Sequence, residues 1–387
     1  MQFRSRILCS LLIATFLCSV RAESSSADDP VLETAQKTLK QLQEKFAPDT
    51  HLAIYDVSIE KCDHGFVLRG EVMSPEARQE TERALTSAGI SATNEVLTLP
   101  AKELEDKVWG IASLSVANGR EEPEQKAELG TQVLMGHTIH IWKRSGRWYL
   151  AQTKDGYLSW VERGSIVRCT QQEAGTWENG PLLVVTAMED QVFETPNTSS
   201  QPVSDIVLGD LVEKVEESRD WYRVRLPDER TGFVSKKSAE DFRHWKQTRK
   251  AGPEVVERTA KLFLGRPYLW GGNSPKGLDC SGFTKMVFFV NGIDLNRNAS
   301  HQALQGKEVE LDPELSHLKK GDLLFFGRGR RDGSQLPRIS HVAIYLGNKT
   351  FIQSSQRVRI SSLDPDSPQY DEQYGRSLVA ARRFLKE

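Results

Sequence analysis

Residues 266–283 of the chain read RPYLWGGNSPKGLDCSGF, a Gly-rich loop that runs directly into a cysteine. The apolar residues that follow recur at spacings of three and four: Phe283, Met286, Val287 and Val290. This spacing predicts a helix that begins at Cys280 and stops at Asn291. The free N–H groups and partial positive charge of a helix N-terminus favour the thiolate, the nucleophilic form of cysteine. We therefore predict that Cys280 is a nucleophile and not a buried structural residue.

A cysteine nucleophile needs a general base, and residues 340–347, SHVAIYLG, place a histidine on a predicted strand. Strand alternation puts the apolar residues of this run on one face and His341 on the other. If an odd-length loop connects this strand to the next strand of a hairpin, Gln353 lies on the same face as His341, within cross-strand reach. Gln353 would then accept from one ring nitrogen while the other faces Cys280. The predicted catalytic residues are Cys280, His341 and Gln353.

Four ordered motifs carry a resemblance to a known family: residues 268–272 (YLWGG), 278–283 (LDCSGF), 321–326 (GDLLFF) and 341–347 (HVAIYLG). Together they resemble the NlpC/P60 family of cell-wall peptidases. The resemblance implies a papain-like α+β fold and hydrolysis of peptidoglycan stem peptides between D-glutamate and a diamino acid. It also implies that Tyr268 orients the site or binds the developing oxyanion. Simple packing is the alternative role for Tyr268 and Trp270.

The order of barrels before a peptidase resembles the γ-D-glutamyl-L-diamino-acid endopeptidases, which act on stem peptides with a free N-terminal L-Ala. Their Arg-Asp-Ser run, whose Asp holds the substrate amine, corresponds here to residues 297–299, Arg-Asn-Ala. Asn298 offers an acceptor without a charge, so a requirement for the free amine stays open.

In the same relatives an acidic residue and a Tyr of the first barrel close the substrate cleft. Tyr157 is the expected Tyr, and His137 stands near the position expected for the acid. Ordinary barrel surface is the alternative for both. The predicted substrate-binding residues are Trp270, Asp279, Ser281, Asn298 and Tyr157.

Between about residues 108 and 241, short apolar alternations broken by turn residues predict small antiparallel barrels without helices. A repeat is visible, because GRWYL at 146–150 and DGYL at 155–158 are echoed by RDWYRV at 219–224 and TGFV at 231–234. Both copies resemble bacterial SH3-like barrels. They are expected at residues 103–172 and 181–243, with a peptidase domain at 250–387.

The segment before the barrels predicts a small α+β unit at residues 23–102. Helix spacing at 31–46 is followed by two strand-like runs at 53–60 and 65–72, a helix from Ser74-Pro75 and a strand at 96–99. This order resembles the BON-type domains of bacterial envelope proteins. The ligand of this unit stays open.

Arg4 and Arg6 precede an apolar run that ends at Val20, which predicts a signal peptide over residues 1–22. The run is shorter than the roughly 20 residues that a membrane-spanning helix needs, so no transmembrane segment is expected after its removal. A lipid anchor at Cys18 is the alternative. Three cysteines then remain, an odd number, so at least one thiol is unpaired. Cys62 and Cys169 are expected to be small buried residues.

Composition excludes several functions. The chain has 51 basic and 53 acidic residues, so no global field would recruit nucleic acid. His137 and His140 would point to opposite faces of a strand, so no metal site is predicted, and no cofactor is implied.

The sequence therefore predicts a multidomain α+β protein: a small N-terminal α+β unit, two SH3-like β-barrels and a C-terminal papain-like domain. We expect a secreted, periplasmic or cell-envelope cysteine endopeptidase, a monomer, that acts on stem peptides or muropeptides. A non-catalytic wall-binding protein is one alternative, and an amidase or acyltransferase using the same Cys–His pair is another. The exact stem-peptide chemistry and the biological role, whether remodelling, recycling or attack on other cells, stay open.

Overall fold

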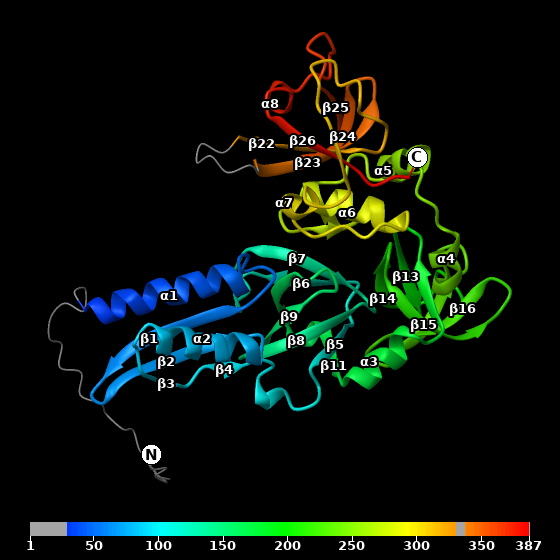
Figure 1. The fold of residues 1–387 in the computed structure, drawn as a ribbon. Helices are drawn as coiled ribbons and strands as arrows, with labels where there is room; N and C mark the ends of the chain where they lie inside the picture. The colour runs from blue at the N-terminus through cyan, green and yellow to red at the C-terminus, as the bar shows by residue number, and fades with distance from the viewer. Residues whose placement is uncertain (1–28, 330–336, 387) are drawn as a thin grey trace, which may run out of the picture.

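The computed structural model describes residues 29–329 and 337–386. An N-terminal unit and two barrels lie in a row, and the C-terminal domain lies across the barrels with helix α6 (Cys280–Val290) facing them (Figure 1). No helix within these residues is long and apolar enough to cross a membrane. The predicted signal peptide lies outside the described residues.

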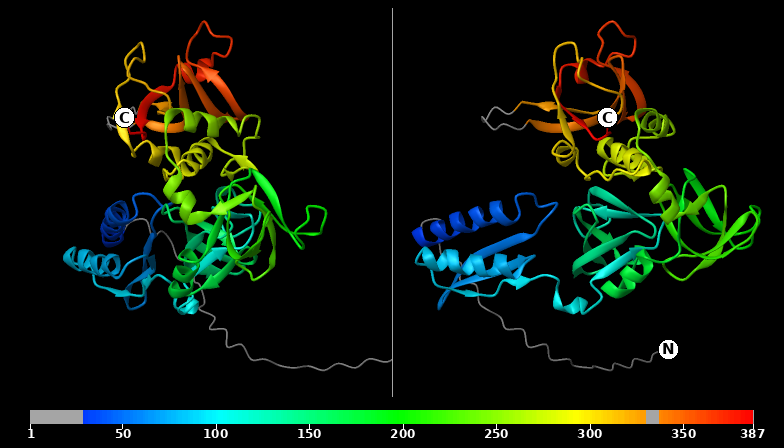
Figure 2. Two further views of the ribbon diagram at one scale, coloured as in Figure 1. Left: turned by 90° about the vertical axis from the view of Figure 1, so that its right-hand side faces the viewer. Right: turned by 45° about the vertical axis from the view of Figure 1, so that its right-hand side comes forward.

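The N-terminal unit has the predicted order of helix, two strands, helix and strand. Its elements are α1 (Pro30–Phe46), β1 (Tyr55–Cys62), β2 (Gly65–Val72), α2 (Pro75–Ser87), β3 (Ala92–Asn94) and β4 (Leu97–Thr98). The predicted last strand is two short strands, both parallel to β2. Ser74 caps α2 as expected, with Pro75 at the first helical position. Both helices cover the same side of the sheet (Figure 2). The likeness to BON-type domains stays a prediction.

Each barrel is a seven-stranded antiparallel sheet. The first contains β5 (Trp109–Ala112), β6 (Val116–Arg120), β7 (Leu129–Leu134), β8 (Thr138–Ser145), β9 (Trp148–Gln152), β10 (Leu158–Glu162) and β11 (Ile166–Cys169). The second contains β12 (Leu182–Val185), β13 (Glu189–Phe193), β14 (Pro202–Val207), β15 (Leu211–Glu217), β16 (Trp221–Arg225), β17 (Thr231–Ser235) and β18 (Ala239–Asp241). The repeat marks equivalent hairpins, β9–β10 and β16–β17.

The prediction of a helix-free connection between the barrels was wrong. Residues Gln171–Glu178 form α3, which begins with a reciprocal capping box between Thr170 and Glu173. Trp177 on this helix donates its indole N–H to Gly136 O at 2.8 Å and packs near Cys169. Capping and tertiary packing therefore order the segment between the two predicted barrels as a helix.

The C-terminal domain packs helices against a six-stranded antiparallel sheet. Its helices are α5 (Pro253–Lys261), α6, α7 (Ala299–Gln302) and α8 (Glu372–Gly375). The preceding helix α4 (Phe242–Thr248) packs on β12 and β18 of the second barrel. The strands of the C-terminal domain are the small hairpin β19 (Asn273–Ser274) and β20 (Gly277–Leu278), then β21 (Lys307–Val309), β22 (Leu323–Arg328), β23 (Arg338–Gly347), β24 (Thr350–Ser355), β25 (Arg357–Ser362) and β26 (Leu378–Arg383). The large sheet has the order β21-β26-β22-β23-β24-β25. Phe283 and Val287 of α6 are fully buried against this sheet.

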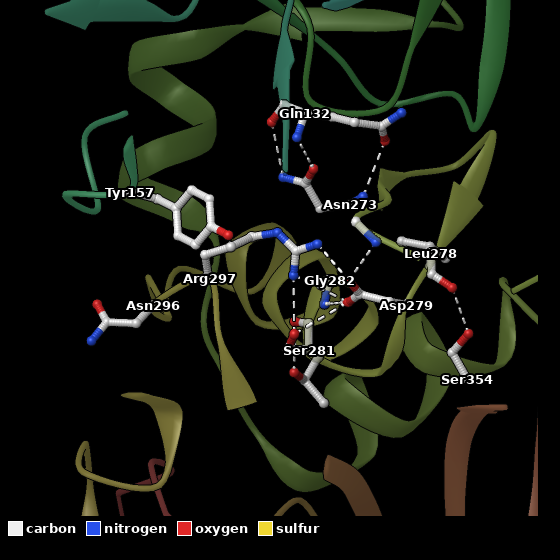
Figure 3. Close-up of polar contacts among 12 residues, drawn as sticks. Gln132, Tyr157, Asn273, Leu278, Asp279, Ser281, Gly282, Asn296, Arg297 and Ser354 are labelled. Atoms are coloured by element: carbon white, nitrogen blue, oxygen red, sulfur yellow. Dashed lines mark hydrogen bonds and ion pairs between the residues drawn. The ribbon is translucent and has the colours of Figure 1, made fainter. Parts of the chain in front are cut away.

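Specific contacts hold the C-terminal domain to the barrels. Gln132 of β7 and Asn273 of β19 exchange hydrogen bonds of 2.8 to 3.1 Å (Figure 3). Lys285 of α6 pairs with Asp155 of the first barrel at 2.8 Å. The peptidase loop and the first barrel therefore form a continuous packed surface next to Cys280.

Candidate active site

Cys280 is the first residue of α6, as predicted. Asp279 caps the helix, and its Oδ1 accepts the N–H of Gly282 at 2.7 Å. A Cβ at Gly282 would lie 2.0 Å from Gly272 O, so only glycine lets the first turn of the helix press onto the Gly-rich loop. The motif thus places the thiol at a helix start that is packed on its own preceding loop.

The expectation that this position argues against burial was wrong. Cys280 is only 8% exposed, because the loop and strand β23 cover it. Burial, followed by the negative charge of Asp279, raises the pKa of the Cys280 thiol to about 12, although N–H groups of Val342 and Ser281 act in the opposite direction. The helix terminus alone therefore does not supply a thiolate in the substrate-free site.

His341 and Gln353 make the predicted contact. Nε2 of His341 lies 2.6 Å from Oε1 of Gln353, and the Gln353 amide nitrogen donates to Ser361 Oγ at 2.9 Å. Because this second bond orients the amide, Nε2 carries the proton and Nδ1 is the basic nitrogen. Burial lowers the pKa of His341 to about 4, so the ring is neutral near pH 7. Val342, the next residue, donates its N–H to Cys280, which places the thiol against the strand of His341.

The hairpin reaches this register by a different route from the predicted odd-length loop. Its turn has two residues, Asn348 and Lys349, both with positive φ. A bulge between Tyr345 and Gly347 supplies the additional residue. Gln353 consequently lies diagonally across from His341 on the same face.

Two tyrosines border Cys280 and His341. Burial and nearby negative charge, that of Cys280 first, raise the pKa of Tyr268, so its hydroxyl lies within electrostatic range of the thiol. Tyr374 stacks on the His341 ring with a centroid separation of 4.5 Å. Sequence reasoning missed Tyr374, because the one-turn helix α8 follows an irregular segment without a recognisable motif.

Asp279 and Ser281, predicted to bind substrate, are engaged inside the protein. The carboxylate of Asp279 accepts two bonds from Arg297, at 3.1 and 2.5 Å, and one from the N–H of Gly271 at 3.0 Å (Figure 3). Ser281 Oγ accepts from Arg297 at 3.0 Å. Arg297 is 2% exposed and was given no role from the sequence. These residues form a buried polar cluster beneath the start of α6.

The first barrel brings Tyr157 to this cluster. Tyr157 is buried beside Arg297 (Figure 3). Its hydroxyl donates to Glu121 Oε1 at 3.0 Å. The acidic neighbour of Tyr157 is thus Glu121. His137 does not lie at the position expected for the acid. Nε2 of His137 donates to Gly209 O at 2.9 Å, and its ring lines a cavity of about 620 Å³ between the barrels and α6. Glu121 directly follows β6, which pairs with β10, so strand pairing decides which acid meets Tyr157.

The two other predicted substrate-binding residues are accessible. Trp270 is 61% exposed on the Gly-rich loop. Asn298 is half-buried at the N-cap of α7, where its side chain makes no capping hydrogen bond. Both side chains are therefore available to a ligand.

The remaining histidines and cysteines have separate environments. The ring of His140 packs between Trp109 and Trp142, away from the surroundings of His137. Within residues 29–329 and 337–386, no group of three His, Cys, Asp or Glu is placed to hold a metal ion. Cys169 is buried as expected, but Cys62 is exposed at the end of β1, contrary to expectation. It ends an edge strand next to a hairpin turn, where no element covers it.

Comparison with known proteins agrees with this architecture. The sequence matches the NlpC/P60 family over residues 265–378, a bacterial SH3 domain over 190–240 and a bacterial dipeptidyl-peptidase SH3 domain over 119–166. A γ-D-glutamyl-L-lysine dipeptidyl-peptidase of Bacillus cereus is 29% identical over 73% of this chain and 79% of its own length. A probable endopeptidase, an NlpC homologue of Haemophilus influenzae, is 30% identical over 49% of this chain and 88% of its own length.

A crystal structure of a Bacillus cereus NlpC/P60 family protein is similar with a TM-score of 0.60 at 25% identity, over 72% of this chain and all of that one. The fold and these relatives define a multidomain cysteine peptidase with two SH3 domains ahead of its catalytic domain. The chain belongs to the NlpC/P60 family of peptidoglycan endopeptidases. The exact domain boundaries stay predictions.

Proposed function

We propose that the protein hydrolyses the γ-D-glutamyl bond to the diamino acid of peptidoglycan stem peptides, with Cys280, His341 and Gln353 as its catalytic residues. The observation that carries this proposal is the 2.6 Å contact between His341 Nε2 and Gln353 Oε1, beside a thiol at a helix start. Relatives named γ-D-glutamyl-L-lysine dipeptidyl-peptidase, from Bacillus cereus and Bacillus subtilis, support the choice of bond.

The proton of the thiol moves when the substrate arrives. The pKa of Cys280 is raised to about 12 and that of His341 is lowered to about 4, so a thiolate–imidazolium pair is disfavoured in the substrate-free site. Nδ1 of His341 therefore takes the thiol proton as Sγ attacks the γ-glutamyl carbonyl. The backbone N–H of Cys280 and the Tyr268 hydroxyl stabilise the oxyanion.

Collapse of the tetrahedral intermediate breaks the C–N bond, and His341 gives its proton to the leaving amine. A thioester between Cys280 and the γ-glutamyl group remains. His341 then takes a proton from water as the water oxygen attacks the thioester. The C–S bond breaks, the γ-glutamyl carboxylate leaves, and His341 returns its proton to the sulfur of Cys280.

Glu121 and Tyr157 are proposed to receive the amino end of the stem peptide. Glu121 is 33% exposed and carries the charge that Asn298 lacks. A carboxylate attracts an ammonium more strongly than a neutral amide does. We therefore propose that the enzyme prefers a free N-terminal L-Ala, with the acidic group supplied by the first barrel.

The test uses synthetic L-Ala-γ-D-Glu-diamino-acid peptides, with L-Lys or meso-diaminopimelate, and mass spectrometry of the products. The dipeptide L-Ala-D-Glu and the free diamino acid are expected with the wild-type enzyme and absent with Cys280→Ala. Unchanged hydrolysis by Cys280→Ala would refute the mechanism. Binding without hydrolysis by the wild type would identify the non-catalytic alternative, and cleavage at another amide or transfer of the acyl group would identify an amidase or acyltransferase.

We also propose that the protein is secreted to the periplasm or cell envelope through the predicted signal peptide. The location of peptidoglycan outside the cytoplasm supports secretion. A monomeric state is a separate part of the proposal. Fractionation of cells that produce the tagged protein, with N-terminal sequencing of the mature form, tests the expected cleavage after Ala22. Light scattering of the purified protein tests the monomer.

A further inference from the structure

Three parts of the molecule meet at the turn Asp49–Leu52, which follows α1. The turn is closed by a hydrogen bond from Leu52 N to Asp49 O at 3.1 Å, and Asp49 Oδ1 accepts the N–H of His51 at 2.8 Å. The first barrel holds this turn, because Leu158 N donates to His51 O at 2.7 Å and Gln152 donates to Leu52 O at 2.9 Å. The N-terminal unit is therefore docked on the strand that follows Tyr157.

The His51 ring covers the residues proposed to receive the substrate amine. It stacks on Tyr157 with a centroid separation of 5.3 Å, and its Nε2 lies 3.5 Å from Glu121 Oε2. The other carboxylate oxygen of Glu121 accepts from Tyr157. The side chain of His51 remains 39% exposed, so a bound ligand can contact the imidazole ring.

Asp49 ties the same turn to the peptidase domain. Its Oδ1 lies 3.0 Å from His51 Nδ1, and its Oδ2 lies 2.6 Å from Nε2 of His301. His301 belongs to α7, the helix whose N-cap is Asn298. Nδ1 of His301 is buried and has no hydrogen-bond partner among the described residues, so the ring is held by Asp49. One carboxylate thus fixes His51 relative to the peptidase segment nearest the proposed amine site.

We propose that His51 is a specificity-determining residue that the N-terminal unit contributes to the amino end of the stem-peptide site, with Asp49 as its positioning residue. This inference rests on the proposed function. An acyl substituent on an amine bound at Glu121 would have to extend past the imidazole that covers Tyr157. The turn therefore excludes stem peptides whose N-terminus is acylated, as it is when the peptide is still attached to the glycan.

The test compares kcat/KM for the free-amine tripeptide with that for the N-acetylated tripeptide. The wild type should prefer the free amine, and His51→Ala should lower the ratio of the two values by about tenfold or more, because the excluded volume is removed. If His51→Ala only reduced the amount of folded enzyme, both apparent kcat/KM values would fall by the same factor, and their ratio would stay unchanged. His64→Ala is the matched control, since His64 is an exposed histidine at the opposite end of β1, and it should keep the wild-type ratio.

Asp49→Ala should lower the ratio in the same direction, whereas Asp49→Asn, which keeps an acceptor for the His51 N–H, should restore it at least in part. A wild-type ratio in His51→Ala would overturn this inference while leaving the proposed function intact. Equal cleavage of both peptides by the wild type would overturn this inference and the proposed preference for a free amine, while the proposed hydrolysis of the γ-D-glutamyl bond would stand. If the wild type cleaves neither peptide, the proposed function fails and this inference fails with it.

Discussion

Arg297 and Asp279 form a buried two-point ion pair beneath the first turn of the helix that carries Cys280. The guanidinium donates to both carboxylate oxygens, while the same carboxylate caps α6 and accepts the N–H of Gly271. Arg297 lies in the segment before α7, so this pair connects the proposed substrate-binding side of the domain to the helix of Cys280. Removing one partner of such a pair leaves a buried charge without compensation.

Arg297→Ala is expected to destabilise the protein by about 3–5 kcal/mol, because the Asp279 carboxylate loses its charged partner. Denaturant unfolding of the two proteins measures the difference. Arg376→Ala is the control, since Arg376 pairs with Glu372 on the surface, and it should unfold like the wild type. Equal stability of Arg297→Ala and the wild type would contradict a structural role for the pair.

Gln353→Ala is expected to lower kcat, because the imidazole of His341 loses the acceptor that sets its tautomer. The loss should be smaller than that of His341→Ala, which removes the base itself and should cost about 10²–10⁴-fold. Steady-state kinetics on the free-amine tripeptide measure both effects. A Gln353→Ala enzyme with the wild-type kcat would show that the ring is oriented by its stacking on Tyr374 alone.

Alkylation of Cys280 by iodoacetamide is expected to be slow near pH 7 and to accelerate as the pH rises toward about 12, the raised pKa of this thiol. The direction follows because burial favours the neutral thiol over the reactive thiolate. The exposed Cys62 provides an internal comparison and should react first. Mass spectrometry of labelled peptides over a pH series gives both rates, and preferential labelling of Cys280 at pH 7 would contradict the structure. Slow labelling is therefore compatible with an enzyme whose thiol is activated only when substrate binds.

Gly271→Ala is expected to disturb the junction between the Gly-rich loop and the first barrel. Gly271 has φ +73°, and a Cβ there would lie 2.0 Å from Leu129 O, so both strain and a backbone clash oppose the substitution. We expect a loss of roughly 1–3 kcal/mol in stability. Gly164→Ala, at a position with nothing within 4 Å of the added Cβ, is the matched control. Identical melting temperatures for the two variants would show that the loop moves away without cost.

Several features of this protein follow from the sequence alone. The spacing of apolar residues after Cys280 determines a helix start, and the pattern around His341 determines a strand whose hairpin partner carries Gln353. The repeated Trp-containing hairpins reveal two barrels. These features are local, because each depends on backbone geometry and periodicity within a few tens of residues.

The remaining features depend on the tertiary structure. The low exposure of Cys280 depends on the strand that covers it. Glu121 is the acid beside Tyr157 because β6 pairs with β10, and His137 does not lie at that position. The contact between Asp49 and His301 joins residues 252 positions apart. No periodicity encodes such contacts, since they arise only when separate units pack and bring their side chains within hydrogen-bonding distance.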